Sequence, residues 1–183
     1  MKKELFEWLQ AIVVGVLFVL LVRAFIFSPV TVEGASMMPT YEDGDKVIVN
    51  KIGMSLGELE RFDVIVFKAT EKDNYIKRII GVPGDHIAYQ NDELYINSEK
   101  YEEPYLAQYK AQLNDGGKLT YDFSLEKLTG VTEVPEGYYF VLGDNRRKSN
   151  DSRSPSVGLI SEDAIMGEAS LRIYPFNQIG IVK

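Results

Sequence analysis

Residues 75–82 read YIKRIIGV, and the turn sequence PGD follows directly at residues 83–85. Runs of β-branched and aromatic residues that end at Pro, Gly or Asp are typical of β-strands, so we expect a strand here. Side chains alternate along a strand, which places Lys77 on one face and Arg78 on the other. A strand this apolar belongs inside a sheet, so its two charged residues need a structural or functional explanation.

The chain on both sides of this strand repeats the pattern. Short runs rich in Val, Ile, Phe and Tyr are separated by turn residues such as those at 42–45. We expect strands at residues 30–33, 46–50, 62–67, 86–89, 93–97, 138–142 and 169–174. Many short strands with frequent turns predict a mainly β fold, an antiparallel sheet or barrel-like domain over residues 28–183.

A more polar stretch interrupts this domain. Residues 86–89 and 93–97 flank the turn at 90–92 and predict a hairpin. Residues 98–135 are polar, and KLTYDF at 118–123 is their only clear strand pattern. We interpret residues 86–135, with approximate boundaries, as a smaller β insertion.

The N-terminus carries a different signal. Residues 8–27 read WLQAIVVGVLFVLLVRAFIF, and a helix of that length spans about 30 Å, the thickness of a bilayer's hydrocarbon core. Lys2 and Lys3 precede this run, and positive residues favour the cytoplasmic side. The pattern therefore predicts one transmembrane α-helix over residues 8–27. A short cytoplasmic N-terminus would comprise residues 1–7, and the β domain would lie outside the cytoplasm.

Two other interpretations compete for this segment. A cleaved secretory signal requires small residues after its apolar core, but residues 25–27 read FIF. A buried core helix normally has a polar stripe, which the run lacks. Both features favour a cell-membrane protein with a single span.

Composition excludes several functional classes. The net charge of −7 and the lack of a dense Lys/Arg run argue against nucleic-acid binding. The chain has no cysteine, so it has no disulfide, thiol nucleophile or cysteine-ligated metal. Its single histidine, His86, follows a turn on the polar face of the expected hairpin, where a surface role is the simpler explanation. One histidine with scattered carboxylates gives no metal-ligand spacing, so we expect no metal and no cofactor.

Elimination leaves few routes to covalent catalysis. Without cysteine the nucleophile must be Ser, Thr, Lys or a carboxylate, and a single histidine at an expected surface position argues against a Ser-His-Asp triad. A lysine acts as a base only when its surroundings lower its pKa, and Lys77 is the best-placed lysine for this. The strand alone leaves two interpretations of Lys77 open, an edge residue that reaches water or a buried functional amine. Ser36, in the loop GASMMPT at 34–40, is by itself an ordinary loop serine.

A third segment joins these two. Residues 143–153 read GDNRRKSNDSR and follow the apolar strand expected at 138–142. Acidic and basic residues alternate here with Ser and Gly. The segment is either a solvated turn or a set of buried ion pairs that fixes a site.

Together these segments resemble the motif set of bacterial type I signal peptidases. The matching pieces are SMMPT at 36–40, KRIIGVPGD at 77–85 and the loop at 143–153, in the family's order and behind an anchor. Residues 61–67, RFDVIVF, resemble a further strand of the family, in which Gly is more usual where Phe62 stands. The single anchor and short chain resemble the Gram-positive form.

The resemblance implies a serine endopeptidase that removes N-terminal signal peptides from exported preproteins after small residues at −3 and −1. It implies Ser36 as the nucleophile, Lys77 as the general base and Ser149 as the residue that orients the lysine amine. The Ser36 N–H would donate to the oxyanion. Some members have a serine two residues before the nucleophile as a second donor, and this chain has Gly34 there.

The resemblance also implies supporting residues and partners. Arg78 with Asp144, and Asp151 with Arg153, would form ion pairs that brace the site. Residues 30–33 and 74–77 would hold the extended substrate between them. The expected pocket walls are Val32, Met37, Tyr41, Tyr75 and Ile76. The implied partners are preproteins and the lipid bilayer, with the protein export machinery nearby.

Two alternatives remain at this stage. One is another Ser/Lys hydrolase, such as a self-cleaving repressor or a processing peptidase with different substrates. Self-cleaving repressors carry a DNA-binding domain, for which this chain has no room. The other is an anchored, non-catalytic β-domain that binds envelope proteins. The presence of Ser36, Lys77 and Ser149 argues against the second alternative.

Overall fold

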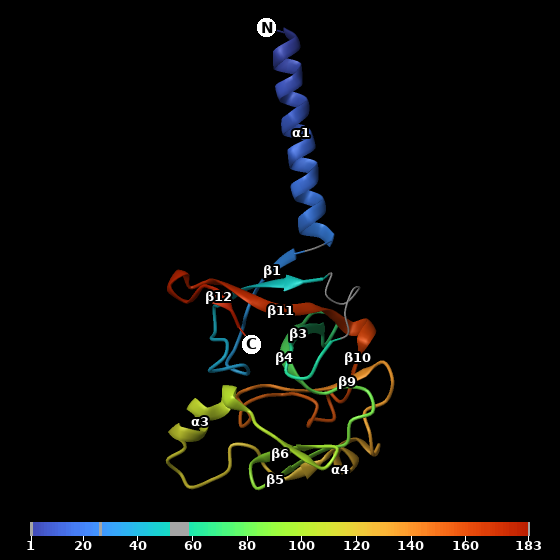
Figure 1. The fold of residues 1–183 in the computed structure, drawn as a ribbon, viewed down its shortest axis with the longest axis vertical. Coiled ribbons are helices and arrows are strands. Elements are labelled where there is room, and N and C mark those ends of the chain that lie inside the picture. Colours follow the sequence, from blue (N-terminus) through green and yellow to red (C-terminus); the bar gives the residue numbers. More distant parts are fainter. Residues whose placement is uncertain (1, 26, 52–58, 183) are drawn as a thin grey trace.

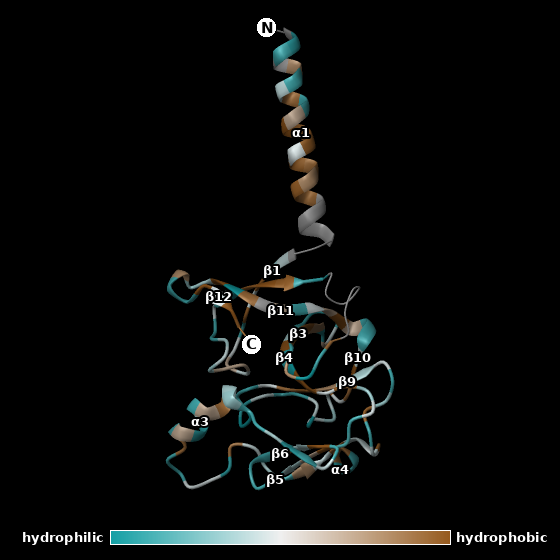
Figure 2. Ribbon diagram, viewed as in Figure 1, coloured by the Kyte–Doolittle hydropathy of each residue, from teal (hydrophilic) through white to brown (hydrophobic). Residues whose placement is uncertain are grey.

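The computed structural model describes the chain except for residues 1, 26, 52–58 and 183. A long helix, α1 (Lys2–Phe25), precedes two antiparallel sheets. Figure 1 shows α1 extending away from the sheets, and Figure 2 shows that its middle is predominantly hydrophobic. The side chains of α1 that the structure describes are all exposed to solvent.

The predicted anchor at residues 8–27 begins inside α1 and includes residue 26, which lies outside the described residues. Among the residues that the structure describes, no helix is both long and apolar enough to cross a membrane.

The larger sheet confirms the prediction of a mainly antiparallel β fold. Within the described chain it has eight strands in the order β1-β2-β11-β3-β4-β9-β10, with β12 paired to β11. The bounds are β1 (Phe27–Thr31), β2 (Lys46–Asn50), β3 (Val64–Lys68), β4 (Asn74–Gly81), β9 (Tyr138–Leu142), β10 (Ile160–Ser161), β11 (Ile165–Tyr174) and β12 (Gly180–Ile181). Short 3-10 helices lie near its last strands, η2 (Glu162–Ala164) and η3 (Phe176–Gln178).

A smaller sheet occupies the region expected to be an insertion. Its described strands have the order β7-β6-β5-β8. They are β5 (Ile87–Gln90), β6 (Glu93–Ile96), β7 (Glu99–Tyr101) and β8 (Phe123–Ser124). The helices here are η1 (Pro104–Leu106), α3 (Ala107–Gln112) and α4 (Leu125–Thr129). The predicted hairpin is confirmed, because β5 pairs directly with β6.

The strand predicted at residues 118–123 is wrong, since only Phe123 belongs to a strand. The Asp92 carboxylate accepts hydrogen bonds from the N–H groups of Leu119, at 3.1 Å, and Thr120, at 2.8 Å. Backbone donors that bind a side chain in this way are not available to a β-ladder. Sequence periodicity gives no sign of this long-range bond.

Strand β4 lies where the core regions meet. Ile76 packs against a cluster around Val32 and Met37, Ile79 belongs to a second cluster, and Ile80 belongs to a third. Ile79 and Ile80 are fully buried, and each stabilises the fold by about 2 kcal/mol through removal of apolar surface from water. The apolar character of residues 75–82 is therefore required by the packing of the whole domain.

The pairing of β4 changes along its length. Residues 74–78 pair with β3, whereas β9 pairs only from Arg78 onward. On the β9 side, residues 74–77 therefore have no strand partner among the described residues. This leaves an open edge beside Lys77.

Candidate active site

Lys77 and Ser36 meet at the open edge of β4. The Lys77 Nζ donates hydrogen bonds to Ser36 Oγ and to the Ile76 carbonyl oxygen, both at 2.8 Å. Only 3% of Lys77 is exposed, and this burial lowers its pKa to about 8, although the negative charges of Asp151 and Asp144 raise it. An amine with this pKa is partly neutral near physiological pH, and in its neutral form it can accept the hydroxyl proton of Ser36.

The loop after β9 holds the backbone around Ser36. The Asn145 N–H donates to the Ser36 carbonyl at 3.0 Å, and the Asn145 side-chain amide donates to the Ala35 carbonyl at 2.9 Å. A Cβ atom on Gly143 would lie 2.5 Å from the Ser36 carbonyl oxygen, so the close approach requires glycine. Gly143 and Asn145 thus fix Ser36. Both residues lie inside the polar loop at 143–153, but their sequence context predicted no role for either.

Ser149 lies beside this contact but does not bond to the lysine in the structure. A Cβ on Gly143 would lie 2.2 Å from Ser149 Oγ, which places the hydroxyl next to the Ser36 backbone. The Ser149 hydroxyl is buried, and it has no hydrogen-bond partner among the described residues. An unpaired buried hydroxyl is unfavourable, so it is a donor and acceptor available to a nearby group.

The first predicted ion pair is entirely buried. The Arg78 guanidinium binds both carboxylate oxygens of Asp144, at 2.7 and 2.9 Å, and both side chains are 0% exposed. Thr40 donates a hydrogen bond to the same carboxylate. Arg78 also donates to the Phe62 carbonyl at 2.7 Å. Phe62 has a φ of 76°, a left-handed conformation that glycine adopts more easily, which explains why glycine suits this position.

The second predicted ion pair connects residues within the polar loop at 143–153. Arg153 binds Asp151, with 2.8 Å between Nη2 and Oδ2, and also donates to the Arg146 carbonyl at 2.7 Å. Asp151 accepts the Gly143 N–H at 3.0 Å. The pair therefore fixes the start of the loop, where Gly143 contacts Ser36.

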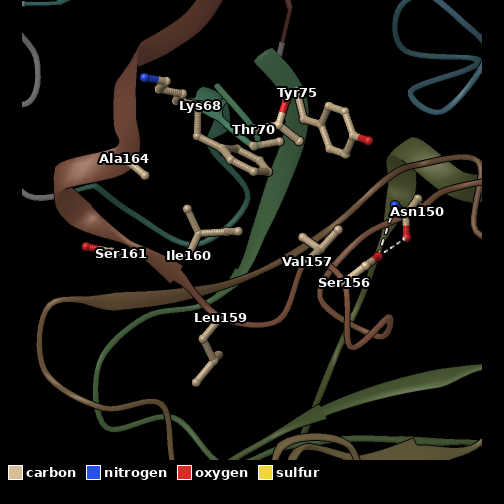
Figure 3. A pocket seen from close by; sticks show the side chains of 12 residues that line it. Lys68, Thr70, Tyr75, Asn150, Ser156, Val157, Leu159, Ile160, Ser161 and Ala164 are labelled. Atoms are coloured by element: carbon tan, nitrogen blue, oxygen red, sulfur yellow. Dashed lines mark hydrogen bonds between the residues drawn. The ribbon is translucent and has the colours of Figure 1, made fainter. Parts of the chain in front are cut away.

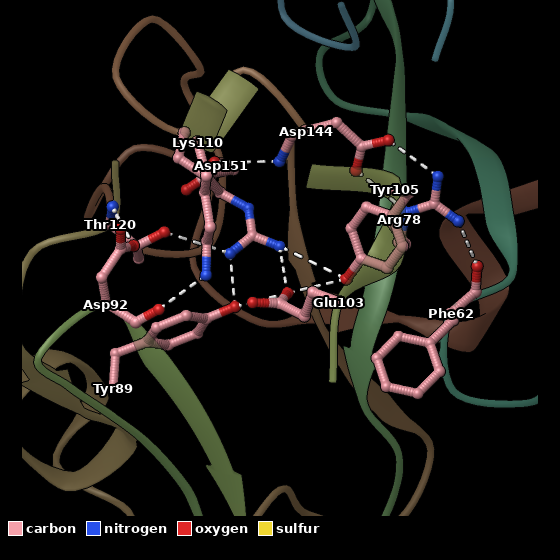
Figure 4. A network of polar contacts seen from close by, with 12 residues as sticks. Phe62, Arg78, Tyr89, Asp92, Glu103, Tyr105, Lys110, Thr120, Asp144 and Asp151 are labelled. Carbon is pink, nitrogen blue, oxygen red and sulfur yellow. Dashed lines mark hydrogen bonds and ion pairs between the residues drawn. The ribbon is translucent and has the colours of Figure 1, made fainter. Parts of the chain in front are cut away.

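A third buried ion pair was not predicted. Arg146 binds Glu103 of the insertion, with 2.5 Å between Nη2 and Oε1, and Tyr89 and Tyr105 each donate to Glu103 at 2.7 Å (Figure 4). The Arg78 guanidinium lies 3.9 Å from the centre of the Tyr105 ring. This network joins the smaller sheet to the polar loop. Its only sequence signal was Arg146 itself, because Glu103 lies in a polar region without a motif.

Replacing Glu103 with alanine is expected to destabilise the fold strongly. The change leaves the Arg146 charge buried without a partner, which costs about 3–5 kcal/mol. Glu102→Ala, a change at the exposed neighbouring residue, is the matched control and should leave stability nearly unchanged. The measurement is the free energy of unfolding from a denaturant titration. Equal stabilities of the two variants would contradict the assigned role of the network.

A groove surrounds the serine and lysine. It has a volume of about 290 Å³ and is lined by Glu33, Gly34, Ala35, Ser36, Asn74, Tyr75, Ile76, Lys77, Lys148 and Asn150. The structure thus brings Tyr75 and Ile76 to the groove. The other expected pocket residues, Val32, Met37 and Tyr41, are buried in the core cluster beside Ile76 and do not line the groove. The Tyr41 hydroxyl, for example, donates to the Ala169 carbonyl at 2.7 Å.

Two backbone N–H groups near the Ser36 side chain differ in whether a hydrogen bond already occupies them. The Gly34 N–H donates to Asp43 Oδ1 at 2.7 Å and is therefore occupied. The Ser36 N–H makes no hydrogen bond to any described residue.

In the described parts of the chain, no group of three or more acidic or histidine side chains is placed to hold a metal ion. His86 lies outside the groove, where its Nδ1 is 2.7 Å from the Thr132 carbonyl oxygen.

Comparison with known proteins identifies the family. The family model described as signal peptidase, peptidase S26, matches residues 5–174. The chain belongs to the signal peptidase family S26. Accordingly it is a serine endopeptidase of the signal peptidase I type, which removes signal peptides.

Relatives support this assignment over nearly the whole chain. The chain is 52% identical over 165 residues to a signal peptidase I of Bacillus caldolyticus, covering 90% of this chain and 89% of that protein. It is 46% identical over 182 residues to signal peptidase IB of Staphylococcus aureus strain Mu50, covering 97% and 94%. A crystal structure of a signal peptidase I from Enterococcus faecalis V583 is similar, with 40% identity and a TM-score of 0.58. That match covers 62% of this chain and 97% of the other.

Proposed function

We propose that this signal peptidase cleaves preproteins with Ser36 as the nucleophile and Lys77 as the general base. The observation that carries the proposal is the buried Lys77 amine, 2.8 Å from Ser36 Oγ on the wall of an open groove. Burial keeps a fraction of this amine neutral without the help of a histidine. A base within hydrogen-bond reach of a hydroxyl is the arrangement that activates a serine.

The reaction has two stages. Neutral Lys77 removes the proton of Ser36 as Oγ attacks the carbonyl carbon of the −1 residue, and the Ser36 N–H stabilises the oxyanion. The Lys77 ammonium then gives its proton to the leaving amine, which departs as the new N-terminus. In the second stage Lys77 takes a proton from the water that attacks the acyl-enzyme carbonyl. The bond to Ser36 Oγ then breaks, Lys77 returns the proton to Oγ, and the signal peptide leaves with a free carboxyl group.

Supporting residues hold these two groups. The buried Ser149 hydroxyl, which lacks a partner in the free enzyme, orients the Lys77 amine during the reaction. The ion pairs of Arg78 with Asp144 and of Asp151 with Arg153 fix the ends of the loop that carries Ser149. The occupied Gly34 N–H does not serve as the second oxyanion donor unless Asp43 releases it.

The substrate binds as an added strand. The open edge of residues 74–77 offers backbone groups to an extended peptide, and residues 30–33 lie along the peptide's other side. Residues at −1 and −3 then point to the same face, towards Ile76. Val32 and Met37 pack directly behind Ile76, which leaves space there only for small side chains.

The chain acts at the cell membrane. Residues 8–27 form the anchor, residues 1–7 are cytoplasmic, and residues 28–183 form the protease domain outside the cytoplasm, with a non-catalytic insertion at about 86–135. The support is the apolar sequence of α1 and its exposed side chains. Signal-peptide-bearing preproteins emerge from the export machinery in the same bilayer, so anchoring raises their encounter rate with the site.

Incubation with a preprotein tests this function. The full-length chain in detergent is expected to release a mature protein whose new N-terminus follows an Ala-X-Ala sequence, as read by N-terminal sequencing. Changing the −1 alanine to leucine should lower kcat/KM by about 100-fold, since a shallow pocket rejects the added methyl groups. An inert enzyme that nevertheless binds several preproteins would favour the non-catalytic alternative.

A further inference from the structure

A second pocket adjoins the catalytic groove. Its volume is about 340 Å³, and both cavities share the side chains of Tyr75 and Asn150. The walls come from the end of β3, the loop with Ser156 and Val157, and β10 and η2 (Figure 3). The residues of these segments take no part in the proposed chemical steps, so the pocket is available to a different part of the substrate.

Tyr75 indicates which substrate side chains reach this pocket. Along β4 the side chains alternate, so Tyr75 and Ile76 point to opposite faces. Ile76 packs with the cluster around Val32, whereas Tyr75 packs with the cluster around Ile160, a wall of the second pocket. The side chains of a peptide added to the β4 edge also alternate between the two faces. Each one points to the same face as the β4 side chain directly opposite it. With −1 and −3 on the side of Ile76, the −2 and +1 residues face the side of Tyr75.

The direction in which the peptide binds decides whether the −2 or the +1 residue lies beside Tyr75. Strands β1 and β4 run the same way, because antiparallel pairings link β1 to β2, β2 to β11, β11 to β3 and β3 to β4. Helix α1 leads into β1 (Figure 1), so under the proposed anchoring a signal peptide enters from the N-terminal end of β1. It then runs parallel to β4, which puts +1 beside Lys77 and −2 beside Tyr75.

We infer that the second pocket binds the side chain of the substrate's −2 residue and accepts a bulky, apolar one. This inference rests on the proposed function. Val157, Ile160 and Ala164 supply apolar wall, and Asn150 and Ser156 supply polar groups near Tyr75 (Figure 3). The volume is at the lower end of the range for ligand pockets and is ample for one leucine or phenylalanine side chain. The −2 position is thereby selected for size, independently of −1 and −3.

Filling the pocket tests the inference. Ser156 is exposed, so Ser156→Trp narrows the pocket without changing the core, and Val157→Phe is a second variant from the same loop. The substrates are one preprotein with Ala, Leu or Phe at −2. Each variant is expected to lower kcat/KM for the Leu and Phe substrates by about tenfold and to leave the Ala substrate nearly unchanged. Retained cleavage of the Ala substrate also shows that the variant is folded.

The control is Gln108→Trp, a change at an exposed residue of α3 that lines neither cavity. It should leave all three substrates unaffected. An unchanged ratio between the Phe and Ala substrates in both pocket variants, or an equal loss for all substrates, overturns the inference but leaves the proposed function intact. Cleavage of the Ala substrate that persists in Ser36→Ala contradicts the proposed function instead.

Discussion

Replacing Ser36 with alanine is expected to abolish preprotein cleavage, with a loss on the order of 10⁴-fold or more in kcat/KM. No other described side chain offers the Lys77 amine a hydroxyl at hydrogen-bond distance in the groove. The Ser149 hydroxyl is close to the Ser36 backbone, but it is buried and Ser149 does not line the groove. Loss of the Ser36 oxygen therefore removes the nucleophile without a substitute.

The fold should survive this change. Ser36 Oγ accepts one hydrogen bond, from Lys77, and that amine keeps its bond to the Ile76 carbonyl. The expected cost to the free energy of unfolding is about 1 kcal/mol or less. The backbone bond from Asn145 to Ser36 does not involve the side chain and is retained.

The assay is a time course of preprotein cleavage with the wild type, Ser36→Ala and Ser98→Ala. Ser98 is an exposed serine that does not line the groove, so its replacement should leave the rate unchanged. Thermal unfolding of the three proteins shows whether a loss of rate reflects chemistry or folding. Residual cleavage by folded Ser36→Ala at a tenth of the wild-type rate would assign the nucleophile to another residue.

Local sequence patterns predict most of the larger sheet because its strands bury apolar side chains. Strands β2 and β9 lie at the predicted residues 46–50 and 138–142. The hairpin of β5 and β6 was also predictable, because turn residues separate two apolar runs. In these segments local preference and burial agree, so periodicity is sufficient.

The site and the insertion depend on contacts between distant residues, which periodicity does not report. Arg78 and Asp144 are 66 positions apart, and their pairing was anticipated only from family resemblance. Arg146 and Glu103 are 43 positions apart and were not paired at all. Polar residues look alike in a sequence whether they are solvated or buried in pairs. The bond from Asp92 that displaces the strand expected at 118–123 has the same long-range origin.

Replacing Lys77 with methionine is expected to lower kcat/KM by about 10²- to 10⁴-fold, the contribution of a positioned general base. Methionine has a similar length and suits a residue that is 3% exposed. Because burial disfavours the charged amine, as its lowered pKa shows, the variant should be at least as stable as the wild type. A loss of activity without a loss of stability identifies Lys77 as a chemical rather than a structural residue.

Two further variants sharpen this result. Lys77→Arg keeps a positive charge, but a guanidinium stays protonated at all working pH values, so it should be as inactive as the methionine variant. Lys72→Met changes an exposed lysine in the turn before β4 and should retain wild-type activity. An active Lys77→Arg enzyme would show that the position requires charge rather than a base.

The dependence of the wild-type kcat/KM on pH tests the role of Lys77 as the base without a mutation. Below its pKa of about 8 the amine is mostly protonated and does not accept the Ser36 proton, so kcat/KM should rise with pH and level off above that value. For one titrating base the rate at pH 6 should be about 100-fold below the plateau. Burial lowers the lysine pKa and the charges of Asp151 and Asp144 raise it. Asp151→Asn should therefore shift the rise to lower pH, whereas a profile that is flat from about pH 5 to 9 would exclude Lys77 as the base.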